Sequence, residues 1–203
     1  MGRRSDHTRE EIRAMALQAT EKLLEKSGLA GLTARKVASA IGYTVGTLYL
    51  VFRNQDDLIQ QANARTLDTL YRRLTALDTR ADPHNGLRAL AREYLRFALA
   101  HTHRWNAIFD HTPSNQKLAP AWYNKRVDRL FAVPESALQA LDPARKPRAV
   151  TLAARALWAG VHGVVVLSLK DKLALGEQTG QPAVLEELVD SLVTNYLVGY
   201  QSP

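Results

Sequence analysis

Two short helical patterns that meet at a glycine constrain the fold of this chain more than any other feature of its sequence. The first pattern runs from Thr33 to Ile41, Gly42 ends it, and the second runs from Thr44 to Phe52. In each pattern a threonine stands where a helix N-cap is expected, and apolar residues recur at helical spacing. Such a unit is typical of helix-turn-helix proteins, although a tight helical hairpin inside an ordinary bundle has the same periodicity.

The second pattern carries no charged residue between Ile41 and Phe52, although the chain has a formal charge of +7. A helix-turn-helix unit lays its second helix in the DNA major groove and leads with its N-terminal residues. Small and hydroxylated residues there let the backbone come close, and they can meet phosphates, base edges or the thymine methyl group. Positive charge stands around this helix instead, on Arg35, Lys36 and Arg53, where it suits phosphate contacts.

Charge and cysteine content exclude only a few classes of function. The pI of about 9.8 permits a polyanionic partner, but basic residues are not concentrated in one part of the chain. The absence of cysteine removes disulfides, thiolate zinc sites and cysteine nucleophiles, and it is compatible with a reducing compartment. The polar N-terminus lacks the apolar core of a signal peptide. We therefore expect a cytoplasmic protein.

Helical signals continue along the rest of the chain, and strand alternation is not found. Further helix starts are predicted where an N-cap residue precedes an acidic residue or a proline: Thr8, Asn54, Asp82-Pro83 and Asp142-Pro143. A short helix is expected around residues 104–110, and a helix after Pro120 is expected to break or bend near Pro134. Residues 185–197 form one apolar helical stripe. The pattern predicts an all-α fold.

The segment 149–169 is apolar nearly all round and has the length of a membrane span. Arg155 and His162 within it make membrane insertion costly, and no second span exists. A helix buried on most sides inside an oligomer is the better interpretation, so no membrane is expected as a partner. Ala156, Gly160 and Gly163 form a small-residue face that suits either a dimer seam or close packing within one subunit.

Residues 8–58 resemble the DNA-binding domain of TetR-family transcriptional regulators. The matching elements are LTARKVASAIGYTVGTLY and the following VFRNQDDL. The resemblance implies a three-helix helix-turn-helix domain over residues 1–55 and a helical ligand-binding and dimerisation domain over residues 56–203. The segment Trp158–Gly163 is also similar to a Trp-x-x-x-His-Gly pattern found in one subgroup of the family's C-terminal domains.

The family motif implies a set of DNA-contacting positions in this chain. Tyr49 and Thr33 would touch phosphate, and Arg35 would reach a base or a phosphate. Two residues depart from the family pattern, since lysine often stands at Gln55 and a polar residue at Val51; both changes make the phosphate contacts weaker, and Arg53 can compensate. The implied DNA-binding residues are Thr33, Arg35, Lys36, Tyr43, Thr44, Val45, Gly46, Thr47, Tyr49, Arg53 and Gln55.

Aromatic residues in the weakly patterned middle of the chain are candidates for a ligand pocket between bundle helices. Trp158 and His162 share a helical face four residues apart, where His162 either offers a hydrogen bond to a ligand or is satisfied by a neighbouring group. The candidate ligand-binding residues are Trp105, Phe109, Trp122, Tyr123, Trp158 and His162. They predict a small hydrophobic or aromatic ligand.

Catalysis and metal binding have little support in the sequence. His101, His103 and His111 lack a carboxylate at a recognisable ligand spacing, so no metal site is expected. A glycine-rich phosphate loop and a nucleophile elbow are also missing, and no cofactor is expected. The sequence therefore predicts a homodimeric, ligand-responsive repressor that binds a palindromic double-stranded DNA operator. A helix-turn-helix architectural or interaction protein that needs no ligand is the alternative.

Overall fold

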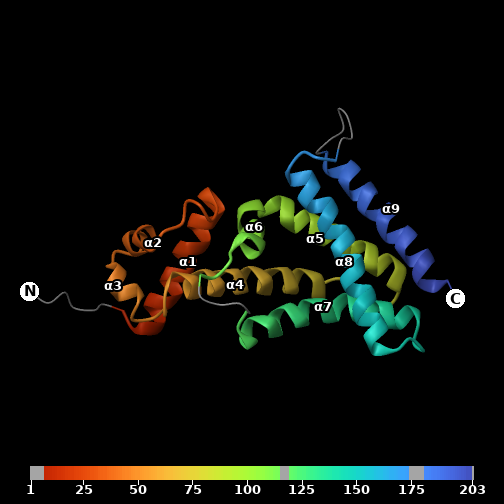
Figure 1. The fold of residues 1–203 in the computed structure, drawn as a ribbon, viewed down its shortest axis with the longest axis horizontal. Coiled ribbons are helices and arrows are strands. Elements are labelled where there is room, and N and C mark those ends of the chain that lie inside the picture. Colours follow the sequence, from red (N-terminus) through yellow and green to blue (C-terminus); the bar gives the residue numbers. More distant parts are fainter. Residues whose placement is uncertain (1–6, 115–118, 174–180, 203) are drawn as a thin grey trace, which may run out of the picture. The chain divides into compact units, whose positions relative to one another are not determined.

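The computed structural model describes residues 7–114, 119–173 and 181–202, which form helices α1 to α9 joined by turns (Figure 1). The described part of the chain contains no strand, and the predicted all-α class is confirmed. The chain divides into two compact units. Residues 1–66 and 101–123 make up unit 1, and residues 67–100 and 124–203 make up unit 2.

Unit 1 is built around three N-terminal helices: α1 (Arg9–Ser27), α2 (Ala34–Ala40) and α3 (Val45–Leu48). The first part of α4 (Gln55–Thr75) and α6 (Thr102–Asp110) complete it. The helix α1 packs against α2, α3 and α6, and α2 packs against α3. Their shared core consists of small and branched side chains, among them Ala16, Leu24, Val37, Leu48, Phe52 and Leu58.

The N-terminal caps of these helices are the ones that the sequence predicts. At α1 the Thr8 side chain accepts a hydrogen bond from the Glu11 amide at 3.2 Å, and the Glu11 carboxylate accepts one from the Thr8 amide at 2.6 Å. Thr33 and Thr44 cap α2 and α3 through their hydroxyl oxygens. Because the first amides of a helix have no partner within the helix, each cap fixes where the helix begins. The capping box at Thr8 is confirmed.

Unit 2 contains the rest of α4 together with α5 (Pro83–Ala100), most of α7 (Ala121–Leu141), α8 (Pro147–Leu169) and α9 (Pro182–Gln201). The helices α5, α8 and α9 pack against one another. Arginines of α5 reach acidic residues of α9, where Arg96 pairs with Glu186 at 2.6 Å and Arg92 pairs with Asp190. The Tyr196 hydroxyl of α9 donates to the Ala153 carbonyl of α8 at 2.8 Å.

The helix break predicted as one alternative near Pro134 is not found, and one predicted helix start is wrong. The helix α7 continues through Pro134, and its next turn contains the buried Ala137 and Leu138; a bend at Pro134 stays a prediction. Asp142-Pro143 does not start α8, which begins at Pro147. The Gln139 amide donates to the carbonyls of residues 142, 143 and 145, and these bonds hold that stretch as a turn.

The helix α8 is long and apolar enough to cross a membrane by length and composition. In the structure α8 instead packs against α5 and α9 of unit 2. One side of α8 is buried and includes Leu157, Val161, Val164 and Val165. Arg155, the charge in the segment, pairs with Glu135 of α7 at 3.0 Å. The helix therefore contributes one buried side to the core of unit 2, and its burial on further sides inside an oligomer stays a prediction.

Candidate nucleic-acid interface

The two short helices of unit 1 are held by a few buried residues that leave one side of each helix open. Leu48 and Phe52 are 1% and 3% exposed, and Val37 of α2 is fully buried. The helix α3 has four residues, so a single turn rests on the Leu48 anchor and on the Thr44 cap. Because both helices are anchored through their buried sides, their other sides remain available to a partner.

Most of the predicted DNA-binding residues lie on this open side. Exposed among them are Thr33, Arg35, Lys36, Thr44, Gly46, Tyr49 and Arg53. Half-buried are Tyr43, Val45, Thr47 and Gln55. The structure thus brings the residues of α2, α3 and the following turn together on the packed three-helix unit α1–α3, which we call the head. Their contacts with DNA remain a prediction.

The two glycines near α3 are there for different reasons. Gly42 has a φ of +74°, a conformation that costs other residues energy, so the turn between α2 and α3 requires glycine. Gly46 has ordinary backbone, and a Cβ atom added there would meet only the Thr44 hydroxyl at 3.7 Å. Nothing in the described chain therefore requires glycine at position 46. Glycine there is compatible with the predicted close approach of this backbone to DNA, which stays a prediction.

Two of the predicted residues also have partners within the head. The Lys36 ammonium donates to the Gly31 carbonyl at 2.7 Å. The Tyr43 hydroxyl and the His7 Nδ1 atom form a hydrogen bond of 2.8 Å. These contacts hold the two side chains beside α2 before any DNA is present, which lowers the entropy lost on binding.

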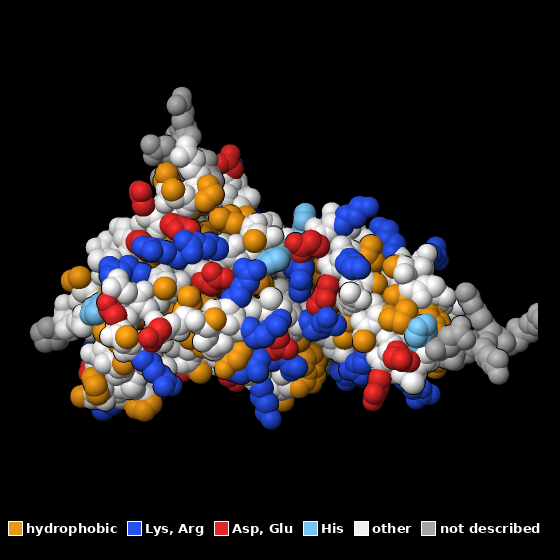
Figure 2. Space-filling view, turned by 180° about the vertical axis from the view of Figure 1, so that it is seen from behind, with side chains coloured by type: hydrophobic (Ala, Val, Ile, Leu, Met, Phe, Trp, Pro, Cys, Tyr) orange, Lys and Arg blue, Asp and Glu red, His pale blue; other side chains and the backbone are white. Residues whose placement is uncertain are grey.

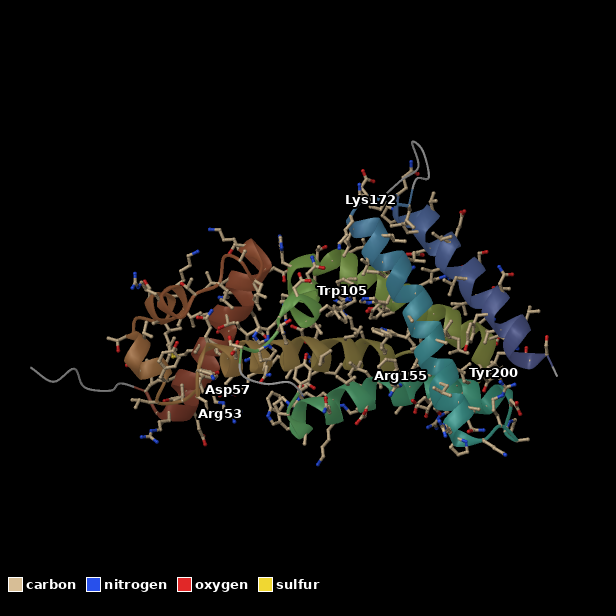
Figure 3. The ribbon with its side chains drawn as sticks, in the orientation of Figure 1. Arg53, Asp57, Trp105, Arg155, Lys172 and Tyr200 are labelled. Carbon is tan, nitrogen blue, oxygen red and sulfur yellow. The ribbon has the colours of Figure 1, made fainter. Side chains whose placement is uncertain are left out.

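Arg53 is tied to the start of α4 by a small hydrogen-bond network. The buried Asp57 carboxylate accepts from the Arg53 amide at 2.9 Å and from the Gln61 side chain at 2.9 Å. Its own amide donates to the Asn54 side chain at 2.8 Å, which confirms the predicted cap. The Arg53 guanidinium is 3.6 Å from Asp57, yet 68% of its side chain is exposed. Arg53 therefore has a fixed backbone and a charged end that can reach a phosphate (Figure 3).

Sequence reasoning missed Leu50, which is 64% exposed directly after α3. The prediction followed the family motif, and that motif ends its recognition helix at the tyrosine. The signal that could have found Leu50 is helical periodicity, because Leu48 and Phe52 face the core and a residue midway between them faces away.

The aromatic candidates of α8 belong to a cluster inside unit 2. The ring centroids of Trp158 and His162 are 4.8 Å apart, and those of Trp158 and Phe131 are 5.4 Å apart. His162 Nδ1 and the Tyr94 hydroxyl form a hydrogen bond of 2.9 Å. Burial lowers the pKa of His162, because a charged imidazolium is poorly solvated there. His162 thus has a protein partner, and Phe131 and Tyr94 join the cluster beyond the predicted residues.

The other four aromatic candidates lie in unit 1. The ring centroids of Trp105 and Phe109 on α6 are 4.8 Å apart, and those of Trp122 and Tyr123 are 5.7 Å apart. Trp105 is 2% exposed, whereas Phe109 is 42% exposed. Burial raises the pKa of Tyr123 to about 12. Their role in ligand binding stays a prediction.

The histidines around α6 bond to carboxylates of unit 1 rather than to each other. His111 Nε2 lies 2.9 Å from Asp56, and His101 Nδ1 lies 3.3 Å from Glu25. The hydrogen bond from His111 lowers the pKa of Asp56. Within residues 7–114, 119–173 and 181–202, no group of three potential ligand residues could hold a metal ion.

Basic and acidic side chains are interleaved on the face that Figure 2 shows, so basic side chains do not gather into a single patch there. Many arginines of unit 2 are neutralised locally, as when Asp68 pairs with both Arg126 and Arg129.

The packed three-helix head with an open, hydroxylated second helix defines a helix-turn-helix DNA-binding protein. Comparison with protein families agrees. Residues 16–62 match the bacterial regulatory proteins of the tetR family, and residues 87–193 match the tetracyclin repressor-like C-terminal domain. The chain belongs to the TetR family of transcriptional regulators. It is therefore a DNA-binding regulator and not an enzyme.

Solved structures share the fold at low sequence identity. A transcriptional regulator from Rhodococcus sp. is 20% identical, with a TM-score of 0.68 over 94% of this chain and 99% of that chain. A tetR-family regulator from Streptomyces coelicolor is 20% identical, with a TM-score of 0.68 over 98% and 81%. A TetR variant from Acinetobacter baumannii, in complex with minocycline, is 21% identical, with a TM-score of 0.66 over 93% and 98%. Comparison with curated protein sequences gives no match.

Proposed function

We propose that this regulator is a homodimeric repressor that binds a palindromic operator and releases it when a small molecule binds to unit 2. The observation that carries the dimer is an exposed apolar face on α8. Leu152, Ala156, Ala159 and Leu167 are exposed at helical spacing, and Leu152 and Leu167 are 61% and 43% exposed. Exposed apolar residues that line up along one helix favour an interface with a partner.

A two-fold dimer fits this face because each subunit then supplies the same surface. The small-residue face of α8 divides into two parts. A Cβ atom at Gly160 would meet Leu192 of α9 in the same subunit at 3.2 Å, whereas one at Gly163 would meet nothing within 4 Å. Gly160 therefore serves packing within the subunit. Ala156 and Gly163 suit the seam, together with Val198 of α9, which is 65% exposed.

A two-fold dimer would present two heads to DNA. Helix-turn-helix dimers read half-sites roughly 34–36 Å apart, or a multiple of that distance, and the operator then mirrors the symmetry of the protein. Such an operator lies on chromosomal DNA, so we infer that the protein acts in the cytoplasm.

The proposed ligand contacts the cluster around Trp158 and His162 and is hydrophobic or aromatic. The cluster offers aromatic faces and a histidine whose pKa is lowered. Its charged members neutralise each other, because Arg155 pairs with Glu135. The structurally similar TetR variant from A. baumannii is in complex with a small molecule, minocycline, which supports a small-molecule ligand here.

The helix α4 is proposed to couple the two activities, since residues 55–66 belong to unit 1 and residues 67–75 to unit 2. A domain boundary near residue 55 remains our proposal for where the DNA-binding function ends. A ligand can only release DNA if it binds more tightly to the form that does not bind DNA. Operator DNA must then weaken ligand binding by the same factor.

The test has two stages. Sedimentation at micromolar concentration should give a dimer, and a monomer would contradict the dimeric repressor. Duplexes selected from a random pool with the purified protein then serve as the operator, and small apolar and aromatic compounds are titrated with and without that DNA, using tryptophan fluorescence. We expect at least one compound to bind more weakly in the presence of operator. If all the compounds fail to bind or show no such linkage, the ligand-independent architectural function replaces the repressor.

A further inference from the structure

Leu50 is an exposed apolar side chain in the turn that follows α3. We call residues 44–52 the recognition turn. Within it Leu50 is 64% exposed, compared with 45% for Tyr49. One exposed leucine needs no explanation by itself; Leu50 matters because it lies in the recognition turn, between the exposed Tyr49 and the core-packed Val51.

The backbone holds Leu50 in place. The amides of Leu50, Val51 and Phe52 donate to the carbonyls of Thr47 and Leu48 at 2.9–3.2 Å, so the turn continues the path of α3. Phe52 is buried and anchors this turn in the core of unit 1. Leu50 is therefore fixed on a supported turn rather than carried by a loose loop.

Gly46 lies one helical turn before Leu50. Side chains of a helix lean towards its N-terminus, so residue 50 leans over residue 46. Gly46 has no side chain, and nothing in the described chain requires glycine there. Gly46 therefore adds no side chain that could cover Leu50.

The recognition turn lacks the side chains that read bases by paired hydrogen bonds. Between Ile41 and Phe52 the sequence is GYTVGTLYLV, which contains no Arg, Lys, Asn, Gln, Asp, Glu or His. Recognition of guanine by Arg or Lys and of adenine by Asn or Gln is therefore impossible from this segment. The exposed or half-buried groups that remain include the hydroxyls of Thr44, Thr47 and the tyrosines Tyr43 and Tyr49, and the apolar side chains of Val45 and Leu50.

We propose that Leu50 reads thymine through the C5 methyl group in the major groove, and that each operator half-site carries a thymine opposite Leu50. The thymine methyl is the apolar group that the major groove displays, and it distinguishes thymine from the other bases by apolar contact. Arg35 and Arg53 beside the turn supply the charge that matches the phosphates of the same groove. The inference rests on the DNA-binding function of the head.

The expected effect follows from the size of the contact. Burying one methyl group stabilises a complex enough to change affinity about fourfold, so two symmetric half-sites give about fifteenfold. Deoxyuridine is the matched probe, because it keeps every hydrogen-bonding group of thymidine and lacks only the methyl group.

The experiment uses the full chain and duplexes enriched by it from a random pool. Each thymine is replaced in turn by deoxyuridine, and affinity is measured by fluorescence anisotropy at fixed salt. We expect one thymine per half-site at which deoxyuridine weakens binding about fourfold in the wild type. With Leu50→Ala, binding to the thymine duplex should weaken about fifteenfold, because both subunits lose the contact, and the same deoxyuridine substitution should have no further effect.

Val51→Ala is the matched control, since it truncates an apolar residue of the same turn that packs against the core. It should lower stability and leave the deoxyuridine effect unchanged. If no thymine responds to deoxyuridine, or if Leu50→Ala keeps the full deoxyuridine effect, the assignment of Leu50 is overturned. If no duplex is enriched from the pool, the DNA-binding function itself fails, and this result is distinct from a negative methyl result.

Discussion

The predicted binding residues of the head in unit 1 are mostly exposed, whereas those of the aromatic cluster in unit 2 contact one another. In the head, Thr44, Gly46, Tyr49 and Arg53 are exposed while Leu48 anchors the turn from below. In unit 2 the candidate residues bind one another, as His162 bonds to Tyr94 and stacks on Trp158. A surface that awaits a large partner must be rigid and open, whereas a small-molecule site must satisfy its polar groups when empty.

The largest loss of stability and of operator binding is expected from replacing Leu48, which anchors the recognition turn in the core. Leu48→Ala removes a side chain that is 1% exposed, and such changes cost roughly 2–5 kcal/mol. Because α3 has only four residues, operator binding should be lost together with the fold of the head. Urea unfolding followed by circular dichroism measures the stability loss. Leu50→Ala, two residues further on, should cost little stability, and equal losses would show that the head is not packed as described.

The next largest effects are expected at the two glycines of α8, where the same substitution should have different consequences. Gly160→Leu places a large side chain against Leu192 within the subunit, so it should destabilise the fold by about 1–3 kcal/mol. Gly163→Leu has space within the subunit and should instead weaken the dimer in sedimentation experiments. A Gly163→Leu protein that dimerises like the wild type would remove this position from the seam.

A smaller effect is expected from the cap of α3. Thr44→Ala removes the hydroxyl that accepts from the Thr47 amide at 3.3 Å, and the loss of such a cap costs about 1 kcal/mol. The loss in free energy of operator binding should exceed the loss in free energy of unfolding, because the same hydroxyl is predicted to contact DNA. Thr44→Ser keeps the cap and is the control.

Tyr49→Ala and Arg35→Ala should weaken operator binding without changing stability. Fluorescence anisotropy at fixed salt measures operator affinity for these two variants and for the two Thr44 variants.

The smallest effect concerns pH and unit 2. Burial lowers the pKa of His162 below its ordinary value of 6.5, so the unfolded chain takes up this proton at a higher pH than the folded chain does. Stability should therefore fall as the pH drops below about 6.5, until His162 is protonated in the folded state as well. His162→Gln should flatten this part of the curve of unfolding free energy against pH. An unchanged curve would contradict the buried, neutral histidine.

The sequence alone predicted the head well because its signals are local. The caps at Thr8, Thr33 and Thr44 and the turn glycine at Gly42 act within a few residues, and the TetR motif covers them. Local hydrogen bonds and backbone preferences decide such features, so the residues themselves carry the information. Leu50 was not predicted because it lies between the two matched elements, which end at Tyr49 and resume at Val51.

The sequence by itself determined the all-α class, the helix-turn-helix head and the apolar character of α8. Only the tertiary structure decided that α7 runs through Pro134, that α8 starts at Pro147, and that Gly160 faces Leu192 rather than a second subunit. It also decided that Tyr94 and Phe131 join Trp158 and His162. The physical reason is that these outcomes depend on contacts between residues far apart in the chain, and periodicity within one helix cannot specify which neighbour a given face meets.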